Sequence, residues 1–204
     1  MRATLAALAL LLAAAGPAWA ESPTDQMQEY TERVLQLIQD AALREKDTLE
    51  ALQAAVRKVA IQVFGAAEAA KAVLGRHWEA RSPAERDDFV QLFAELLEAT
   101  YIARMDGDGG IRIRYVGELV EGDRADVRAR VFTRKGREVT VDARLVHHDG
   151  RWLVYDLTVE QVSLVGNYRA QFDRIIRKSG YEELVRLVRA KRDQLLHSKR
   201  AAAD

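Results

Sequence analysis

The sequence predicts an α+β domain, in which several helices pack on one face of a four-stranded antiparallel sheet. Apolar residues recur every three or four positions over most of the first hundred residues and again near the C-terminus, which is the helical period. Between these parts, after the glycine-rich run 107–110, the apolar spacing changes to two, the period of strands. Helices, then consecutive strands, then helices is the order typical of an α+β domain.

Residues 1–20 have the features of an export signal. Arg2 precedes an apolar stretch at 3–15, and the tripeptide 18–20, Ala-Trp-Ala, has the small-x-small pattern of a signal-peptidase site. The alternative is a membrane anchor, but about 13 apolar residues rise only about 20 Å as a helix, short of a hydrocarbon core of about 30 Å. We therefore expect cleavage after Ala20 and export of the remaining chain.

The composition of the remaining chain excludes several functions. Removing Arg2 from the 31 Lys and Arg leaves 30 against 31 Asp and Glu, and a net charge of −1 does not favour nucleic acid as a partner. The chain has no cysteine, so it holds no disulfide, no thiol nucleophile and no cysteine-bound metal or lipid anchor. Residues 21–200 have the length of one domain, and we expect 201–204 to be a disordered tail.

Capping chemistry predicts four helix starts in this domain. Each has a capping side chain followed three residues later by an acid, and two also have proline at the first helical position. An amphipathic stripe follows each start, and the alanine-rich segment 65–75 is expected to form one more short helix. The capping residues are Ser22, Asp47, Ser82 and Ser179.

Four strands are predicted from the period of two. The first begins at Ile111, the second covers 127–132 and the third covers 139–145. The fourth, 151–156, follows the tight turn at 149–150, where Asp-Gly is typical of a two-residue hairpin. We expect these strands to form an antiparallel meander.

The loop between the second and third strands sets their register. A three-residue loop at 135–137 places apolar residues side by side on one face and charged residues on the other. Two alanines then lie together at the centre of the apolar face and leave a depression, which is either the place where a helix packs closely or the floor of a cavity. The expected pairs are Val127 with Leu145, Ala129 with Ala143, Val131 with Val141 and, on the charged face, Arg130 with Asp142.

Histidine gives little support for a metal site. His147 and His148 are adjacent on a strand, so their side chains point to opposite faces and do not bind one ion together. His77 and His197 are isolated in the sequence. We therefore expect no metal and no cofactor.

Asp156 is the one acid expected to face the apolar pocket. With a two-residue loop at 149–150 it falls on the same face as Ala143. There it is either a general base whose pKa is raised by burial, or a structural acceptor for a backbone amide or an arginine such as Arg169.

The segment 169–200 contains ten basic and four acidic residues. This excess of positive charge is either a solvated helix face or a surface for anionic lipid or an acidic partner.

Two blocks of the sequence are unlike generic helix or strand sequence. The first is Val73-Leu74-Gly75-Arg76-His77-Trp78, Ser82-Pro83, Glu85-Arg86, Phe89, Phe93, Leu96-Leu97 and Tyr101. The second is 151–156, Val159, the string Ser-Leu-Val-Gly-Asn-Tyr-Arg-Ala-Gln-Phe at 163–172, Ile175-Ile176, Gly180-Tyr181 and Leu184. Together they resemble the MlaC-type periplasmic phospholipid-binding proteins, also described as toluene-tolerance ABC-transport auxiliary proteins, over nearly the whole mature chain.

Two positions depart from the pattern of this family. The family usually has Asp-Phe after the position of Phe64, where this chain has Gly65-Ala66, and this bears on the shape of the pocket. The family usually has glycine where this chain has Gln161, and this bears on the bend between the last strand and the following helix.

The resemblance implies a periplasmic carrier that encloses phospholipid acyl tails in an apolar pocket and moves lipid between the inner and outer membranes. The implied partners are phospholipid, an inner-membrane ABC-transporter complex and an outer-membrane lipoprotein complex. A related branch carries hopanoid or another lipid. From the apolar face and the family signature we expect the lining to consist of Leu96, Leu97, Tyr101, Val127, Ala129, Val131, Val141, Ala143, Leu145, Val154, Val165, Tyr168 and Phe172.

Two other functions remain open at this point. The chain is alternatively an enzyme with a cone-shaped α+β fold that uses Asp156 as a base on a small hydrophobic substrate. It is otherwise a structural envelope protein whose core is filled by its own side chains.

Overall fold

The computed structural model describes residues 21–43, 49–102, 111–133 and 136–203. The predicted signal peptide at 1–20 and the predicted cap at Asp47 lie outside these ranges. The helices are α1 (Pro23–Leu43), α2 (Leu49–Val63), α3 (Ala66–Leu74), η1 (Gly75–His77), α4 (Pro83–Tyr101), α5 (Leu164–Ser179) and α6 (Tyr181–Ala203). The strands are β1 (Arg112–Glu121), β2 (Arg124–Phe132), β3 (Glu138–His148), β4 (Arg151–Val159) and β5 (Val162–Ser163).

Capping side chains begin the helices as the sequence predicts. The Ser22 hydroxyl accepts a hydrogen bond from Asp25 N at 3.0 Å, and α1 starts at Pro23. At α4 the Ser82 hydroxyl accepts from Glu85 N at 3.2 Å, while the Glu85 carboxylate accepts from Ser82 N at 2.8 Å. This capping box, with its hydrogen bond from the Ser82 amide, lowers the pKa of Glu85.

The C-terminal helix differs from the prediction at both ends. Ser179 is the last residue of α5, and Gly180, at φ 88°, separates α5 from α6. Helix α6 then continues to Ala203, so the tail predicted to be disordered at 201–204 is helical up to that residue. Alanine has the highest helix propensity, which allows the helix to continue through 201–203.

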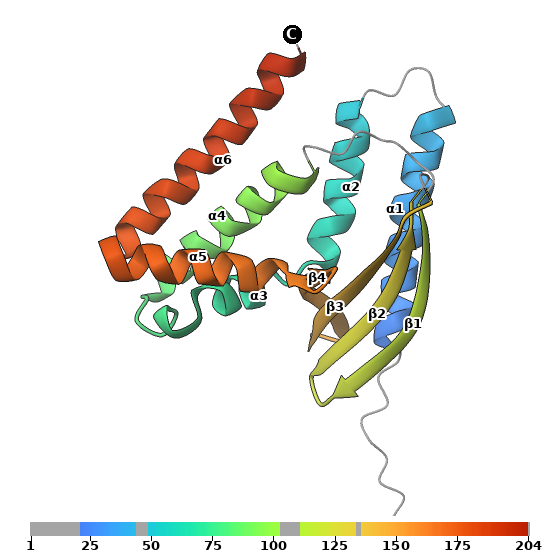
Figure 1. Ribbon diagram of the computed structural model, residues 1–204, viewed down its shortest axis with the longest axis horizontal. Coiled ribbons are helices and arrows are strands. Elements are labelled where there is room, and N and C mark those ends of the chain that lie inside the picture. Colours follow the sequence, from blue (N-terminus) through green and yellow to red (C-terminus); the bar gives the residue numbers. More distant parts are fainter. Residues whose placement is uncertain (1–20, 44–48, 103–110, 134–135, 204) are drawn as a thin grey trace, which may run out of the picture.

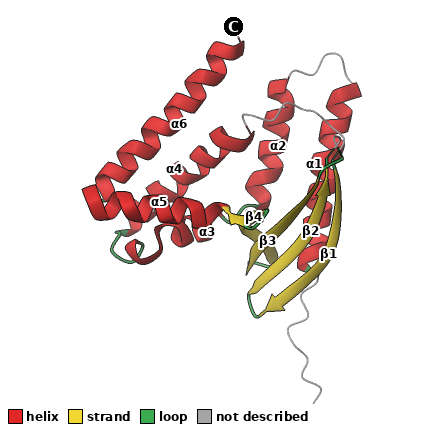
Figure 2. Ribbon diagram, viewed as in Figure 1, coloured by secondary structure: helices red, strands yellow, loops and turns green. Residues whose placement is uncertain are grey.

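The strands form one antiparallel sheet in the order β1-β2-β3-β4-β5, which confirms the α+β fold (Figure 2). There are five strands rather than the predicted four, because the chain turns back after β4 and adds the two-residue strand β5 to its edge. The turn is made by Glu160 and Gln161, both in the left-handed region, at φ 48° and 69°. The family position that usually holds glycine is therefore one that requires positive φ.

The register of β2 against β3 is two residues away from the predicted one. The connection spans five residues, 133–137, and pairs Phe132 with Glu138, because Thr133 and Arg137 close the loop through hydrogen bonds of 2.9 Å and 3.2 Å. A shift of two keeps every side chain on its predicted face. It separates the two alanines, however: Ala129 lies opposite Val141, Ala143 opposite Val127, and Leu145 opposite Ala125. On the charged face, Asp142 binds Arg128 rather than Arg130.

A β-bulge in β4 moves Asp156 away from the face on which it was predicted. The hairpin loop has two residues, as expected, and Leu145 pairs with Val154. The register then slips by one, so Arg144 rather than Ala143 lies opposite Asp156. Asp156 is therefore on the charged face, and Leu157, opposite Ala143, is on the apolar face.

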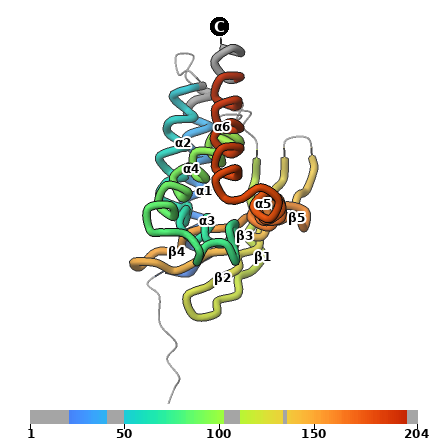
Figure 3. The backbone as a smooth tube through the Cα atoms, turned by 90° about the vertical axis from the view of Figure 1, so that its left-hand side faces the viewer, coloured from blue at the N-terminus to red at the C-terminus, as the bar shows by residue number. Residues whose placement is uncertain are grey.

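The apolar side chains gather in separate clusters on the two sides of β4. The sheet with α1 and α2, called here the sheet layer, contains one cluster around Leu145 and Trp152 and another around Ile38 and Val56. Helices α3, η1, α4, α5 and α6, called here the helical bundle, surround a third cluster centred on Phe93. Figures 1 and 3 show α2, α4 and α6 rising on the same side of α3 and α5.

Candidate functional site

The apolar face of the sheet is well covered at one end only. Near the β3–β4 turn, Leu145, Trp152 and Val154 are buried with Val127 and Ala143, and residues of α1 and α2 pack against them. The side-chain oxygen of buried Gln26 also accepts a hydrogen bond from Trp152 N, which fixes α1 to the sheet edge. This end of the face is part of the folding core.

The other end of the same face carries adjacent apolar side chains that solvent reaches. Ala143 pairs with Leu157, Val141 with Val159, and Val159 with Val162. Leu157, Val159 and Val162 are 37%, 44% and 62% exposed, and Val131 and Val141 are half-buried. Adjacent exposed apolar side chains on one face are unusual for a surface without a binding role. The group, called here the apolar strip, is Val131, Val141, Leu157, Val159 and Val162.

The bulge in β4 is what brings Leu157 and Val159 onto this face. Regular alternation from Val154 would place them on the charged face, and the extra residue at Tyr155 reverses this. Sequence reasoning missed both residues. The sequence gives no clear signal of the bulge, because 152–155 are all apolar and Leu153, Tyr155, Leu157 and Val159 keep a regular period of two.

The predicted helical part of the lining lies in the helical bundle. Leu96, Val165 and Phe172 are buried there, and Leu97 and Tyr168 are half-buried beside them. The Tyr168 ring is 5.4 Å from that of Phe93 and 5.5 Å from that of Phe172, centroid to centroid. These aromatic contacts give the bundle a rigid core on the side of α5.

Tyr101 lies at the end of this aromatic group and is 50% exposed. Partial burial raises the pKa of its phenol, and the neighbouring Tyr168 hydroxyl adds to the effect. Tyr101 therefore places an apolar ring and a polar tip at the edge of the bundle, an arrangement suited to a boundary between hydrocarbon and water.

The predicted lining is thus divided between the two parts of the fold. Its strand residues lie in or beside the sheet layer, and its helical residues lie in the bundle. Of the strand residues, Val131 and Val141 belong to the apolar strip, whereas Ala129 is buried beside it and Val127, Ala143, Leu145 and Val154 are buried in the folding core.

Asp156 acts as a cap for α5. It is buried, its Oδ2 accepts a hydrogen bond from the Ser163 hydroxyl at 2.6 Å, and its Oδ1 accepts one from Val165 N at 2.9 Å. Arg144 Nη1 lies 3.9 Å away. These contacts agree with the structural interpretation of this residue, because both carboxylate oxygens are engaged in fixing the start of the helix.

Arg169 is not the partner of Asp156. It lies against Gly75, where an added Cβ would be 2.8 Å from Arg169 Nε. Gly75 also has φ 52°, which favours glycine, and the Arg169 guanidinium would have to move to admit a Cβ there. This contact explains why Gly75 and Arg169 occur together in the two signature blocks.

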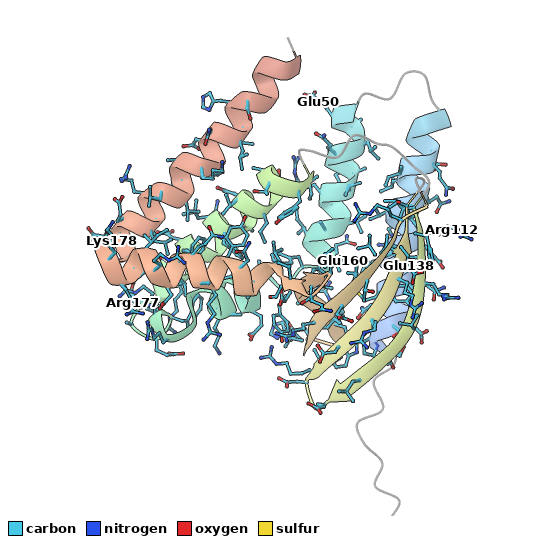
Figure 4. All side chains as sticks on the ribbon, in the orientation of Figure 1. Glu50, Arg112, Glu138, Glu160, Arg177 and Lys178 are labelled. Carbon is cyan, nitrogen blue, oxygen red and sulfur yellow. The ribbon has the colours of Figure 1, made fainter. Side chains whose placement is uncertain are left out.

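The basic C-terminal segment is partly neutralised by ion pairs. Arg186 binds Glu183, and Arg192 binds both Glu95 and Asp193. Arg177 and Lys178 lie at the end of α5 away from the sheet (Figure 4).

Three further features are independent of the predicted lining. An open depression of about 240 Å³ lies on the charged face, where Arg124, Asp126 and Arg144 contribute to its wall. No described helix is long and apolar enough to cross a membrane. Among the described residues, no group of three or more His, Asp or Glu is arranged to hold a metal ion.

Comparison with known proteins adds three findings. The family model for the MlaC protein matches residues 28–190. The intermembrane phospholipid transport system binding protein MlaC of Haemophilus influenzae is 24% identical over 169 residues, which cover 80% of this chain and 79% of that protein. A solved structure of a phospholipid-binding protein from Ralstonia solanacearum, in complex with a phospholipid, matches with a TM-score of 0.75 and 21% identity, over 86% of this chain and 99% of that one. The structural match shows a shared fold.

Proposed function

The chain belongs to the MlaC family, and on this basis we propose that it is a phospholipid carrier, not an enzyme, that holds acyl tails between the apolar strip and the helical bundle. The observation that supports the proposal most is the apolar strip itself. Leu157, Val159 and Val162 are exposed side by side on the face that elsewhere forms the folding core. A bound acyl chain would give these side chains the apolar contact that no helix supplies there.

The energetics of such a carrier follow from the length of its cargo. Each CH₂ removed from water contributes about 0.8 kcal/mol, so two chains of about 16 carbons contribute roughly 25 kcal/mol. Exposing a third of that surface would cost about 8 kcal/mol, or almost six powers of ten in affinity. Most of both tails must therefore be buried, which requires the predicted residues Leu97, Tyr101 and Tyr168 of the bundle as well as the strip.

Tail burial supplies most of the binding energy, so discrimination between headgroups should be weak. Release into water should be slow for the same reason, and delivery then requires a partner that opens the site. We propose the partners to be an inner-membrane ABC-transporter complex and an outer-membrane lipoprotein complex. The compartment would be the periplasm, reached after removal of residues 1–20.

Native mass spectrometry of the protein purified from cells tests the proposal directly. A bound mass equal to one phospholipid per chain is the expected result, and it also identifies the lipid. Protein that consistently carries no lipid, even after incubation with phospholipid vesicles, would contradict the proposal.

A pair of matched variants tests the position of the site. Val159→Asp places a charge in the apolar strip, and we expect it to reduce lipid loading by at least about tenfold, since a buried unpaired carboxylate costs several kcal/mol. Leu119→Asp is the control, because Leu119 is 57% exposed and lies opposite Asp126 on the charged face. Circular dichroism should show both variants to be folded. Equal loading of the two variants would place the site elsewhere.

A further inference from the structure

The sheet layer and the helical bundle are joined firmly at one end. The chain crosses β4 at Phe64 and Gly65, where Gly65 N donates to Val154 O at 2.9 Å. A Cβ at Gly65 would be only 3.2 Å from Leu153 Cβ, so the crossing is in close contact with the strand. The capping of α5 by Asp156 and the 2.8 Å bond between Arg124 of β2 and Glu68 of α3 add further connections at this end.

At the opposite end, the last turn of α4 in the helical bundle contacts α2 in the sheet layer. Glu98 Oε1 lies 2.6 Å from Arg57 Nε of α2, and the two side chains are 33% and 38% exposed. Ile102, directly after α4, packs against the cluster that contains Ile38 and Val56. The contacts at this end thus include an ion pair whose two side chains are partly exposed.

We propose that the Arg57–Glu98 ion pair is a latch that holds the two parts together and limits the rate at which lipid enters and leaves. The inference rests on the proposed function. The covalent crossing at Phe64–Gly65 acts as the hinge, and separation of α2 from α4 opens the space beside Leu97 and Tyr101. Glu98 is adjacent to Leu97 and one helical turn from Tyr101, so the latch lies at the edge of the proposed site.

The structure also supplies a matched control. Glu95, one turn before Glu98 on α4, binds Arg192 of α6 at the same 2.6 Å distance, and the two side chains are 38% and 25% exposed. Both helices belong to the helical bundle. An Arg–Glu ion pair of similar exposure, whose arginine also binds Asp193, therefore lies within one part of the molecule, where it would not restrain opening.

The first test compares neutral variants of the two pairs. The rate at which NBD-labelled phospholipid moves from phosphatidylethanolamine–phosphatidylglycerol vesicles to the protein should rise about two- to fivefold in Arg57→Gln, the range expected from a partly exposed ion pair. Arg192→Gln should change the rate by less than that. The exchanged pair Arg57→Glu with Glu98→Arg should return the rate towards that of the parent protein. Equal rates in Arg57→Gln and Arg192→Gln would overturn the latch.

The second test uses the absence of cysteine from the chain. Cysteines at positions 57 and 98, joined by a short bis-methanethiosulfonate that forms a reducible disulfide with each thiol and releases methanesulfinate, should slow lipid transfer at least tenfold until dithiothreitol is added. The same reagent joining cysteines at 95 and 192 should leave the rate unchanged. Transfer through the cross-linked 57–98 protein at the rate of the uncross-linked one would rule out opening at this place.

A third measurement separates failure of the latch from failure of the proposed function. Spin labels at Glu50, at the end of α2 away from the hinge, and at Lys191 of α6, both exposed, report the distance between the two parts without any lipid. Arg57→Gln should broaden the distribution towards longer distances, and Arg192→Gln should not. A protein that opens in this way but never carries lipid would keep the latch and refute the carrier function. A distribution unaffected by Arg57→Gln would refute the latch even if lipid is carried.

Discussion

Asp173 of α5 shows how one charged residue connects two distant parts of the chain. It accepts hydrogen bonds from Arg76 Nη2 at 2.6 Å and from His77 Nε2 at 2.9 Å. The hydrogen bond from His77, followed by that from Arg76, lowers the pKa of the Asp173 carboxyl. The sequence marked Arg76 and His77 only as members of a signature block, because their partner lies 97 and 96 positions further on.

The lowered pKa of Asp173 predicts how its contribution depends on pH. The carboxyl ionises more readily in the folded chain than in the unfolded one, so its contribution is complete above the unfolded pKa of about 4 and is lost as the pH falls through the lowered folded pKa. Thermal unfolding of the parent protein and of Asp173→Asn should differ at pH 7, and the difference should shrink below about pH 4. A difference that stays constant down to pH 3 would contradict this account.

At the scale of single elements, the sequence predicted features that depend on neighbouring residues, such as where a helix starts. Ser22 and Ser82 begin α1 and α4 as expected, since a cap acts on residues three positions away. The predicted register of β2 against β3 was wrong by two residues. The expected loop, 135–137, is shorter than the observed connection, 133–137, which Thr133 and Arg137 close by hydrogen bonds. The apolar face was nevertheless correct, since a shift of two preserves it.

Gln161 carries a testable consequence of the turn between β4 and β5. An L-residue at φ 69° is strained by about 1 kcal/mol, and glycine is not, so Gln161→Gly should stabilise the protein by about 0.5–1 kcal/mol. Gln171→Gly, within the exposed face of α5, should instead destabilise it by about 1 kcal/mol. Chemical denaturation measures both changes. A loss of stability in Gln161→Gly would show that this side chain makes contacts that outweigh the strain.

At the scale of the whole molecule, periodicity identified apolar faces but not which faces meet. The predicted lining combined the apolar sheet face with helices expected to face it, and the structure places these two sets of residues in separate apolar clusters. Such long-range packing depends on where the chain crosses β4, at Gly65, and no local pattern encodes that position. The bulge at Tyr155 was missed for a related reason, because the apolar residues Leu153, Tyr155, Leu157 and Val159 alternate regularly in the sequence and hide the change of face.

The proposed carrier function predicts that stability depends on the cargo. A ligand present at about a hundred times its Kd stabilises the folded state by about 2.7 kcal/mol, which corresponds to a rise in Tm of roughly 5–10 °C for a domain of this size. Removing bound lipid with detergent or organic solvent and refolding should therefore lower the Tm, and adding phospholipid should restore it. A Tm that is the same with and without lipid is the result expected of a structural protein whose own side chains fill its core.

Because of the extra residue at Tyr155, the two halves of β4 have different structural roles. Trp152 and Val154, before the bulge, are constrained by the folding core, whereas Leu157 and Val159, after it, are constrained mainly by whatever touches the open end of the sheet. Substitutions at Leu157 and Val159 should therefore cost less stability than substitutions at Trp152 and Val154. In the proposed carrier, the contact with the cargo could therefore be altered at two positions of one strand while Trp152 and Val154 stay the same.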